Sequence, residues 1–211
     1  MPLRSRPLRL RIGVTGHRVL PDPPAVSSRI GEFLRHQIGV MVSPPLDPDG
    51  SEPRLVFILL SSLAEGADRL AAGVVMASEG GELEAVLPLP AEEYLKDFSL
   101  PESKAEFRSW LERSRRVVVL SPGGADAGRK EIREAAYEKA GRWVVDHCDL
   151  LVAVWDGLPA KGRGGTAEIV AHALWMRVPL AIVPADGAGV IRCEPGRGIL
   201  RPGPEKSVPE R

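Results

Sequence analysis

The sequence predicts an α/β fold, in which a doubly wound, mostly parallel sheet carries helices on both faces. Short apolar runs alternate with longer amphipathic segments through most of the 211 residues. The runs are apolar without interruption, which is typical of parallel strands that are buried on both faces. Glycine, hydroxyl-bearing and charged residues follow the ends of these runs, where doubly wound folds bind their ligands.

Apolar runs and helical spacing predict the strands and helices in the first half of the chain. Residues 8–14 alternate apolar and basic side chains and then become fully apolar, as a strand entering a core does. The next apolar residues recur every three or four positions behind Pro23 and Pro24, which suit a helix start. In order, we expect a strand at 8–14, a helix at 25–42, a loop at 43–53, a strand at 54–60, a helix at 67–78 and a strand at 82–87.

The second half continues the alternation. An apolar stripe that includes Ile132, Ala136 and Tyr137 predicts a long helix. In order, we expect helices at 92–98 and 103–115, a strand at 117–120, a helix at 130–147, a strand at 149–155, a helix at 169–178 and a strand at 179–183. Composition then predicts a single domain at 8–184, with an N-terminal tail at 1–7 and a mobile C-terminal tail at 185–211.

Composition limits the function classes. The hydrophobic fraction of 44% and the charged fraction of 27% are ordinary for a globular protein, and the formal net charge is zero. Neutrality removes the broad electrostatic argument for a nucleic-acid partner. No apolar run is long enough for a bilayer and the N-terminus lacks a signal-peptide core, so we expect a cytoplasmic protein without a membrane partner. Cys148 and Cys193 lack metal-ligand spacing, and we expect neither a metal nor a cofactor.

The most informative stretch is the Gly-rich turn at 162–168, between a strand and a helix. Glycines let the backbone approach a ligand closely, and the free N–H groups of a helix start attract anions. Gly164, Gly165 and Thr166 are therefore predicted ligand contacts, together with Asp156 at the end of the preceding strand. The alternative is a flexible loop with an ordinary helix N-cap.

A second polar turn follows the first strand. Thr15 and Gly16 offer a hydroxyl and a flexible backbone, His17 can donate to a phosphate or stack on a base, and Arg18 can clamp a phosphate. The alternative is that Arg18 pairs with Asp22 and that His17 caps the sheet.

Four more predicted ligand contacts follow the second strand: Ser61, Glu65, Gly66, which would let a phosphate approach, and Asp68. This turn lacks the full Gly-x-Gly-x-x-Gly fingerprint, which argues against a dehydrogenase. Glu65 and Asp68 either hold ribose hydroxyls or only stabilise the helix dipole. Glu168, one turn inside the later helix, has the same alternatives and a third, as the carboxylate of a glycosidic cleavage.

Two apolar features carry predictions of their own. Tyr94 follows the third strand and is a candidate for stacking on a base, or equally a lid residue packed on the core. The helix at 169–178 is apolar on nearly every side, which predicts burial on two sides. We expect a homodimer to cover it, unless a loop or the C-terminal tail does so.

Together, the motifs resemble the SLOG superfamily, which groups SMF/DprA-like proteins with the LOG (lonely guy) phosphoribohydrolases. The resemblance spans about residues 8–183 and rests on the ordered set of motifs at 13–18, 61–69, 87–98, 155–157 and 164–166. It implies a Rossmann-like fold and a pocket for a nucleotide or nucleotide-derived ligand. Many bacterial members look like sensors in stress or defence systems, in which a separate effector protein acts.

The Gly-rich motif departs from that of the LOG enzymes, in which Glu follows Thr by three residues. Here Glu168 follows Thr166 by two, and one residue turns a helix by about 100°. The leading hypothesis is therefore a module that binds a nucleotide-derived ligand. The alternative is a phosphoribohydrolase that cleaves the N-glycosidic bond of nucleoside 5′-monophosphates, with Glu168 as its catalytic carboxylate. A DprA-like binder of single-stranded DNA is disfavoured by the neutral charge.

Overall fold

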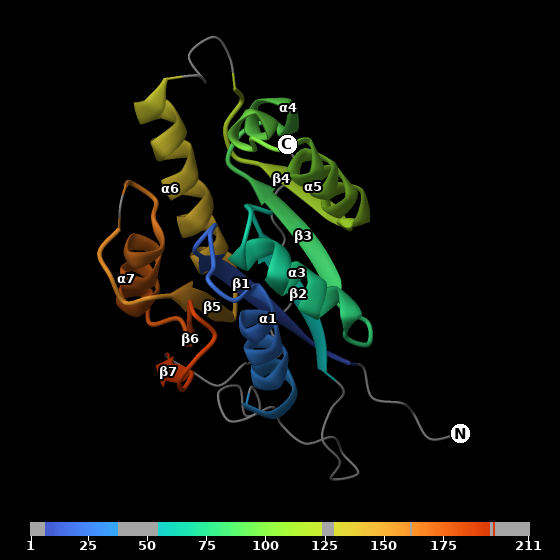
Figure 1. Cartoon of the computed structure of the whole chain (residues 1–211), viewed down its shortest axis with the longest axis vertical. Helices are drawn as coiled ribbons and strands as arrows, with labels where there is room; N and C mark the ends of the chain where they lie inside the picture. The colour runs from blue at the N-terminus through green and yellow to red at the C-terminus, as the bar shows by residue number, and fades with distance from the viewer. Residues whose placement is uncertain (1–6, 38–54, 124–128, 161, 195, 197–211) are drawn as a thin grey trace.

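A seven-stranded sheet with helices on both faces forms the body of the protein (Figure 1). The computed structural model describes residues 7–37, 55–123, 129–160, 162–194 and 196. All strands are parallel except the last, which confirms the predicted fold class. The predicted ends at 1–6 and 197–211, and the loop at 43–53, lie outside the described residues.

The observed elements follow the predicted order. The strands are β1 (Leu8–Gly16), β2 (Leu55–Ser61), β3 (Glu82–Leu87), β4 (Arg116–Val119), β5 (Leu150–Trp155), β6 (Leu180–Pro184) and β7 (Arg192–Glu194). The helices are α1 (Pro23–Glu32), α3 (Ala67–Ala77), α4 (Ala91–Tyr94), α5 (Pro101–Arg113), α6 (Lys130–His147) and α7 (Thr166–Met176), with a π-helical turn η1 (Phe33–Gln37) after α1 and a 3-10 turn η2 (Leu95–Asp97) after α4.

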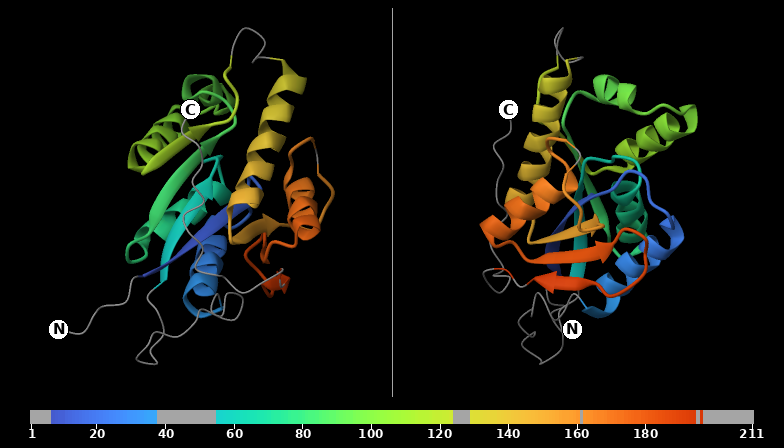
Figure 2. Two further views of the ribbon diagram at one scale, coloured as in Figure 1. Left: turned by 180° about the vertical axis from the view of Figure 1, so that it is seen from behind. Right: turned by 60° about the vertical axis from the view of Figure 1, so that its left-hand side comes forward.

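The strand order, β4-β3-β2-β1-β5-β6-β7, places β2 to β4 on one side of β1 and β5 to β7 on the other. From β1 the chain adds strands in one direction up to β4, then returns to lie beside β1 and adds strands in the other direction. Helices α1, α3, α4 and α5 cover one face, and α6 and α7 cover the other (Figure 2). The strand order therefore reverses between β1 and β5, where Gly16 is paired with Val154.

Alternation along β1 divides the core in two. Leu10, Ile12 and Val14 are buried under α1 and α3, in the larger cluster. The residues between them face the other side, where α6 and α7 pack in a smaller cluster that includes Val144 and Ile169. This two-sided burial is the reason why the strands read as continuous apolar runs.

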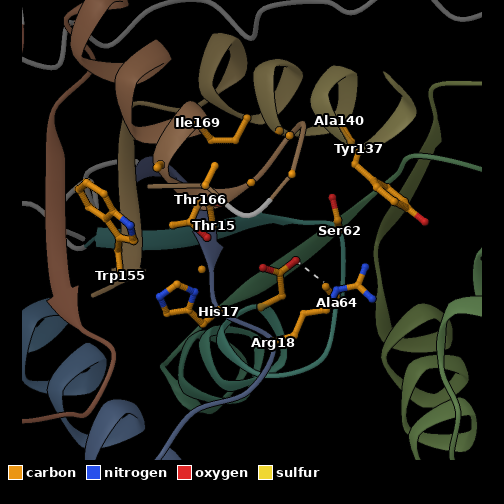
Figure 3. A pocket seen from close by; sticks show the side chains of 18 of the residues that line it. Thr15, His17, Arg18, Ser62, Ala64, Tyr137, Ala140, Trp155, Thr166 and Ile169 are labelled. Carbon is orange, nitrogen blue, oxygen red and sulfur yellow. Dashed lines mark hydrogen bonds between the residues drawn. The ribbon is translucent and has the colours of Figure 1, made fainter. Parts of the chain in front are cut away.

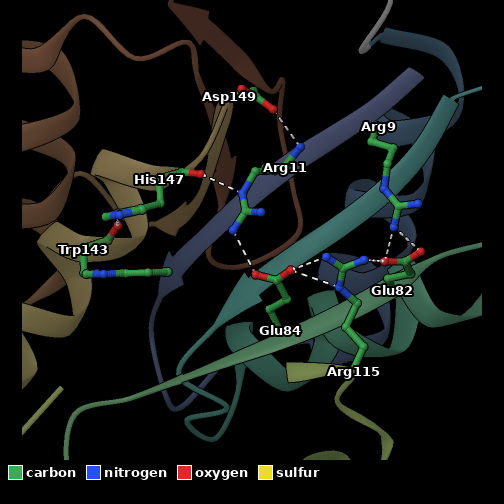
Figure 4. A network of polar contacts seen from close by, with 8 residues as sticks. All are labelled: Arg9, Arg11, Glu82, Glu84, Arg115, Trp143, His147 and Asp149. Atoms are coloured by element: carbon green, nitrogen blue, oxygen red, sulfur yellow. Dashed lines mark hydrogen bonds and ion pairs between the residues drawn. The ribbon is translucent and has the colours of Figure 1, made fainter. Parts of the chain in front are cut away.

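On the face of the sheet that α6 covers, a network of charged side chains lies over β2 and β3 (Figure 4). Glu84 of β3 is fully buried and accepts hydrogen bonds from Arg11 at 2.9 Å and from Arg115 at 3.0 Å. Arg115 also bonds Glu82, which pairs with Arg9. Because each oxygen of Glu84 has an arginine partner, this buried carboxylate is compensated.

Two expectations about the ends of the fold are corrected. The segment after 185, predicted as a tail, contains β7, which pairs antiparallel with β6 and places Cys193 opposite Ala181. The domain therefore extends at least to Glu194. The helix predicted at 25–42 is α1 followed by the π-helical turn, and its last five positions lie outside the described residues.

Helix α7 is not buried on all sides. Ile169, Val170 and Ala173 are buried, whereas Leu174, Trp175 and Met176 are 49%, 76% and 43% exposed. The apolar residues of α7 therefore lie on two surfaces of the helix: one packs on the sheet, and the other is exposed to solvent in the single chain. Within the described part of the chain, no helix is both long and apolar enough to cross a membrane.

Candidate functional site

A cavity of about 430 Å³ opens at the carboxyl ends of β1 and β5 (Figure 3). This is the point where the strand order reverses, at which doubly wound folds bind ligands. Its walls come from the end of β1, the loop between β2 and α3, the middle of α6, and the loop from β5 into α7. Segments far apart in the sequence therefore meet here.

The Gly-rich turn and the start of α7 form one wall. Gly164 has φ of +75°, and a Cβ there would lie 2.6 Å from the backbone nitrogen of Glu138 on α6, so only glycine fits. Gly165 is the N-cap, and Thr166 and Ala167 begin the helix. Within the described residues, the N–H groups of Thr166 and Ala167 make no hydrogen bond. Unpaired donors at a helix start form an anion site.

Glu168 does not contribute to the cavity. Its Oε2 accepts the Gly164 N–H at 2.7 Å, and its side chain is exposed outside the cavity wall. The carboxylate thus caps the turn that precedes its own helix. The prediction of a ligand-binding or catalytic Glu168 is not supported by this position, because its carboxylate is directed back along the turn.

The turn after β1 also lines the cavity, through Thr15, Gly16, His17 and Arg18. Gly16 is required by packing, since a Cβ there would lie 2.5 Å from Ala67 Cβ. Close packing of this kind holds the β1 turn against the start of α3.

His17 and Asp156 connect the two walls. His17 Nε2 lies 3.1 Å from Asp156 Oδ1 and 3.3 Å from the Asp156 backbone nitrogen. A protonated Nε2 donates to the carboxylate and an unprotonated Nε2 accepts the N–H, so either form of the ring has a partner. Hydrogen bonds from the Leu158 N–H and from His17 hold the pKa of Asp156 below its usual range. The pair of Arg18 with Asp22, which was the alternative to a ligand role for Arg18, is not formed, because Asp22 instead caps α1 through the Ala25 N–H at 3.0 Å.

Asp68 is the buried carboxyl group of the cavity, 6% exposed. Its Oδ2 accepts hydrogen bonds from the Ser61 hydroxyl at 3.1 Å and from the Ala64 N–H at 3.3 Å. Burial raises the pKa of Asp68 to about 6, although these hydrogen bonds and the charge of Arg18 favour the carboxylate. Ser61, predicted as a ligand contact, lies behind Asp68 and positions it.

Two other residues of the β2–α3 loop that the sequence predicts as ligand contacts lie outside the cavity wall. Glu65 turns away from the cavity and accepts a hydrogen bond from Ser103 of α5. Gly66 is also outside the cavity wall, and a Cβ there would lie 2.4 Å from the backbone oxygens of His17 and Arg18. The missing side chain of Gly66 lets the β2–α3 loop contact the turn after β1, and does not make room for a phosphate.

Tyr94 reaches the cavity wall but is 1% exposed, so its ring has no free face for a base. It packs edge-on against Phe98 and Phe107, with ring centroids 5.1 Å and 5.6 Å away. The open tyrosine is Tyr137 of α6, which sequence reasoning assigned only to an apolar helix stripe. Tyr137 is only partly buried, and nothing in helical spacing distinguishes it from a core residue.

Sequence reasoning also missed Ser62, Trp155 and the α6 residues Ala140 and Gly141, all of which line the cavity. A Cβ on Gly141 would lie 2.5 Å from Ile169 Cδ1, so this glycine brings α6 close to α7. A glycine inside a long predicted helix was the available signal, since such a glycine often marks close packing.

Among the residues that the structure describes, no group of three or more His, Cys, Asp and Glu side chains is placed to hold a metal ion. The chain matches no protein-family model, and no curated protein matches it either. The fold and the geometry of the cavity therefore carry the functional argument.

Proposed function

We propose that the protein binds a nucleotide or nucleotide-derived ligand in the cavity at the β1–β5 switch point, as a sensing module in a stress or defence system rather than as a hydrolase. The observation that carries this proposal is the pair of unpaired N–H groups of Thr166 and Ala167, at the wall of a cavity in the usual ligand position of this fold class.

The cavity suits a ligand with an anionic end and a polyhydroxylated middle. The two N–H groups and the hydroxyls of Thr15 and Thr166 can surround a phosphate. Asp68, the predicted ribose contact that does line the cavity, offers carboxylate lone pairs to ribose hydroxyls. A volume of about 430 Å³ falls within the range of small-molecule sites.

The resemblance to the SLOG superfamily supports the same ligand class. The orientation of Glu168 favours binding over hydrolysis, because the carboxylate proposed for glycosidic cleavage caps the Gly turn instead of meeting the ligand. A sensor in this superfamily acts through a separate effector protein, and we propose that such a partner reads the ligand-bound state.

A homodimer is the second part of the proposal. Leu174, Trp175 and Met176 form an exposed apolar patch on α7. His172, which stacks on Trp175, contacts the half-exposed side chains of Arg142 and Asp146. A two-fold related copy can cover the patch and set these opposite charges against each other at its rim. Light scattering at micromolar concentration should give a dimer, and Trp175→Ser should give a monomer. A monomeric wild-type chain would leave the patch to the effector and refute the dimer.

The ligand proposal is tested by calorimetric titration with nucleoside 5′-monophosphates and two matched variants of Thr166. Thr166→Pro removes the N–H and the hydroxyl, yet proline is accepted at the first position of a helix, and Gly165 already has extended backbone. Thr166→Ala removes the hydroxyl alone.

We expect Thr166→Pro to weaken binding about tenfold or more, which corresponds to one charge-assisted hydrogen bond, and Thr166→Ala to weaken it less. Wild-type protein that binds no nucleotide, or equal losses in the two variants, would contradict the proposal. Release of free base from the monophosphates, followed by chromatography, would establish the hydrolase instead.

A further inference from the structure

Tyr137 lines the cavity, and its hydroxyl is held by other side chains of the protein. Its hydroxyl donates to Asp97 Oδ2 and accepts from Arg133 Nε at 3.1 Å. Arg133 also pairs with Asp97, so the three side chains brace one another. Because the hydroxyl already has a donor and an acceptor partner, a ligand can meet this residue only through the aromatic ring.

Arg18 stands opposite that ring. Its Cζ lies 5.9 Å from the centroid of the Tyr137 ring, and Figure 3 shows the two side chains on the same side of the cavity. Within the described residues, Arg18 makes no hydrogen bond, and its side chain is exposed. The guanidinium is therefore free to shift, whereas the ring is braced.

The separation is informative. Two stacked planes touch at about 3.5 Å, so direct stacking would need about 3.5 to 4 Å, and a flat ring held between two planes needs about 7 Å. The observed 5.9 Å is too wide for direct stacking and about 1 Å short of a gap that admits an aromatic ring. A small movement of the long, exposed Arg18 side chain would widen the gap by this 1 Å.

The position fits the rest of the proposed ligand. Figure 3 shows Thr166 and Tyr137 well apart across the cavity, with Ser62 between them in this view. A phosphate at the start of α7 and a ribose near Asp68 would leave the third part of a nucleotide toward Tyr137.

We propose that Arg18 and Tyr137 clamp the base of the bound nucleotide between guanidinium and ring, and that purines are held more tightly than pyrimidines. This inference rests on the proposed function and adds to it the site of base recognition. It assigns Arg18 to the base rather than to the phosphate for which the sequence predicts it. Guanidinium planes and aromatic rings both stack on nucleobases, and a purine overlaps them over a larger area.

The competing position for the base is Trp155, the other partly buried aromatic side chain in the cavity wall. Its Nε1 donates to the Leu158 oxygen at 2.9 Å, which fixes the indole near the end of β5. Trp155→Leu is therefore a matched control for Tyr137→Leu, since both replace an aromatic wall residue by leucine.

The experiment compares affinities for AMP, CMP and ribose 5-phosphate, measured by calorimetry on the wild-type chain, Tyr137→Leu, Tyr137→Phe and Trp155→Leu. We expect wild type to bind AMP more tightly than CMP. Tyr137→Leu should weaken AMP about tenfold and leave ribose 5-phosphate unchanged, because only the base loses its partner. Tyr137→Phe keeps the ring and should stay close to wild type.

Three results would overturn the clamp. Equal losses of AMP and ribose 5-phosphate in Tyr137→Leu would mean a structural role, and a selective AMP loss in Trp155→Leu would place the base on the tryptophan. Equal wild-type affinities for AMP and ribose 5-phosphate would mean that the base is not read at all. If wild type binds none of the three compounds, the proposed function itself fails, which separates the two failures.

Discussion

Asp68→Asn is expected to make the protein more stable at neutral pH. The carboxyl group is 6% exposed, and burial raises its pKa from the ordinary value of 3.8 to about 6. A raised pKa means that the folded state binds the proton more tightly than the unfolded state. Stability from this group is therefore highest when both states are protonated and falls as the pH rises from about 4 through 6.

The size of the effect follows from the pKa difference of about 2. At 1.36 kcal/mol per pKa unit, the charged carboxylate costs about 3 kcal/mol of folding free energy at pH 7. Asparagine keeps an oxygen for the Ser61 hydroxyl and the Ala64 N–H, and its amide can face the cavity, so the substitution removes the charge without breaking these contacts.

Urea unfolding of both proteins at several pH values measures this difference. The stability advantage of Asp68→Asn should be near zero at pH 4, open between pH 4 and 6, and level off at about 3 kcal/mol above pH 6. Glu92→Gln, which changes an exposed carboxylate, should show a small advantage at most, because solvent screens the charge. The reasoning would be refuted by a difference in unfolding free energy between the two proteins that does not change with pH, or by an Asp68→Asn variant that is less stable than wild type at pH 7.

Three further predictions concern packing and burial. Gly164→Ala places a Cβ 2.6 Å from an α6 backbone nitrogen at a φ of +75° and should cost about 2 kcal/mol in urea unfolding, whereas Gly162→Ala, with only a side-chain atom at 3.7 Å, should be near neutral; equal costs would contradict the packing argument. Glu84→Ala leaves two arginines without their buried partner and should cost about 3 kcal/mol by the same measurement, and a neutral result would mean that the arginines find water instead. Cys148 is 7% exposed and burial raises its pKa to about 12, so a thiol reagent should titrate Cys193 alone in the folded protein and both thiols in denaturant, and two fast thiols in the folded state would count against this burial.

Much of the fold was already determined by local pattern. The continuous apolar run at 55–60 and the helical stripe of residues 130–147 are visible in the sequence, because burial on both faces and 3.6-residue spacing are local properties. The short antiparallel β7 escaped prediction, since it is exposed and its pairing with β6 depends on a partner strand rather than on its own composition.

For the site, the sequence determined which turns matter, and the tertiary structure decided which side chains they present. Gly, Thr and Arg at the ends of β1 and β5 indicated Thr15, Arg18 and Thr166, because ligand sites of this fold class lie at the ends of parallel strands. The direction of a side chain depends on its neighbours in space. Glu168 caps its own turn. Tyr137 lines the cavity from α6, where Asp97, from a distant part of the chain, and Arg133, one turn earlier on the same helix, brace its hydroxyl.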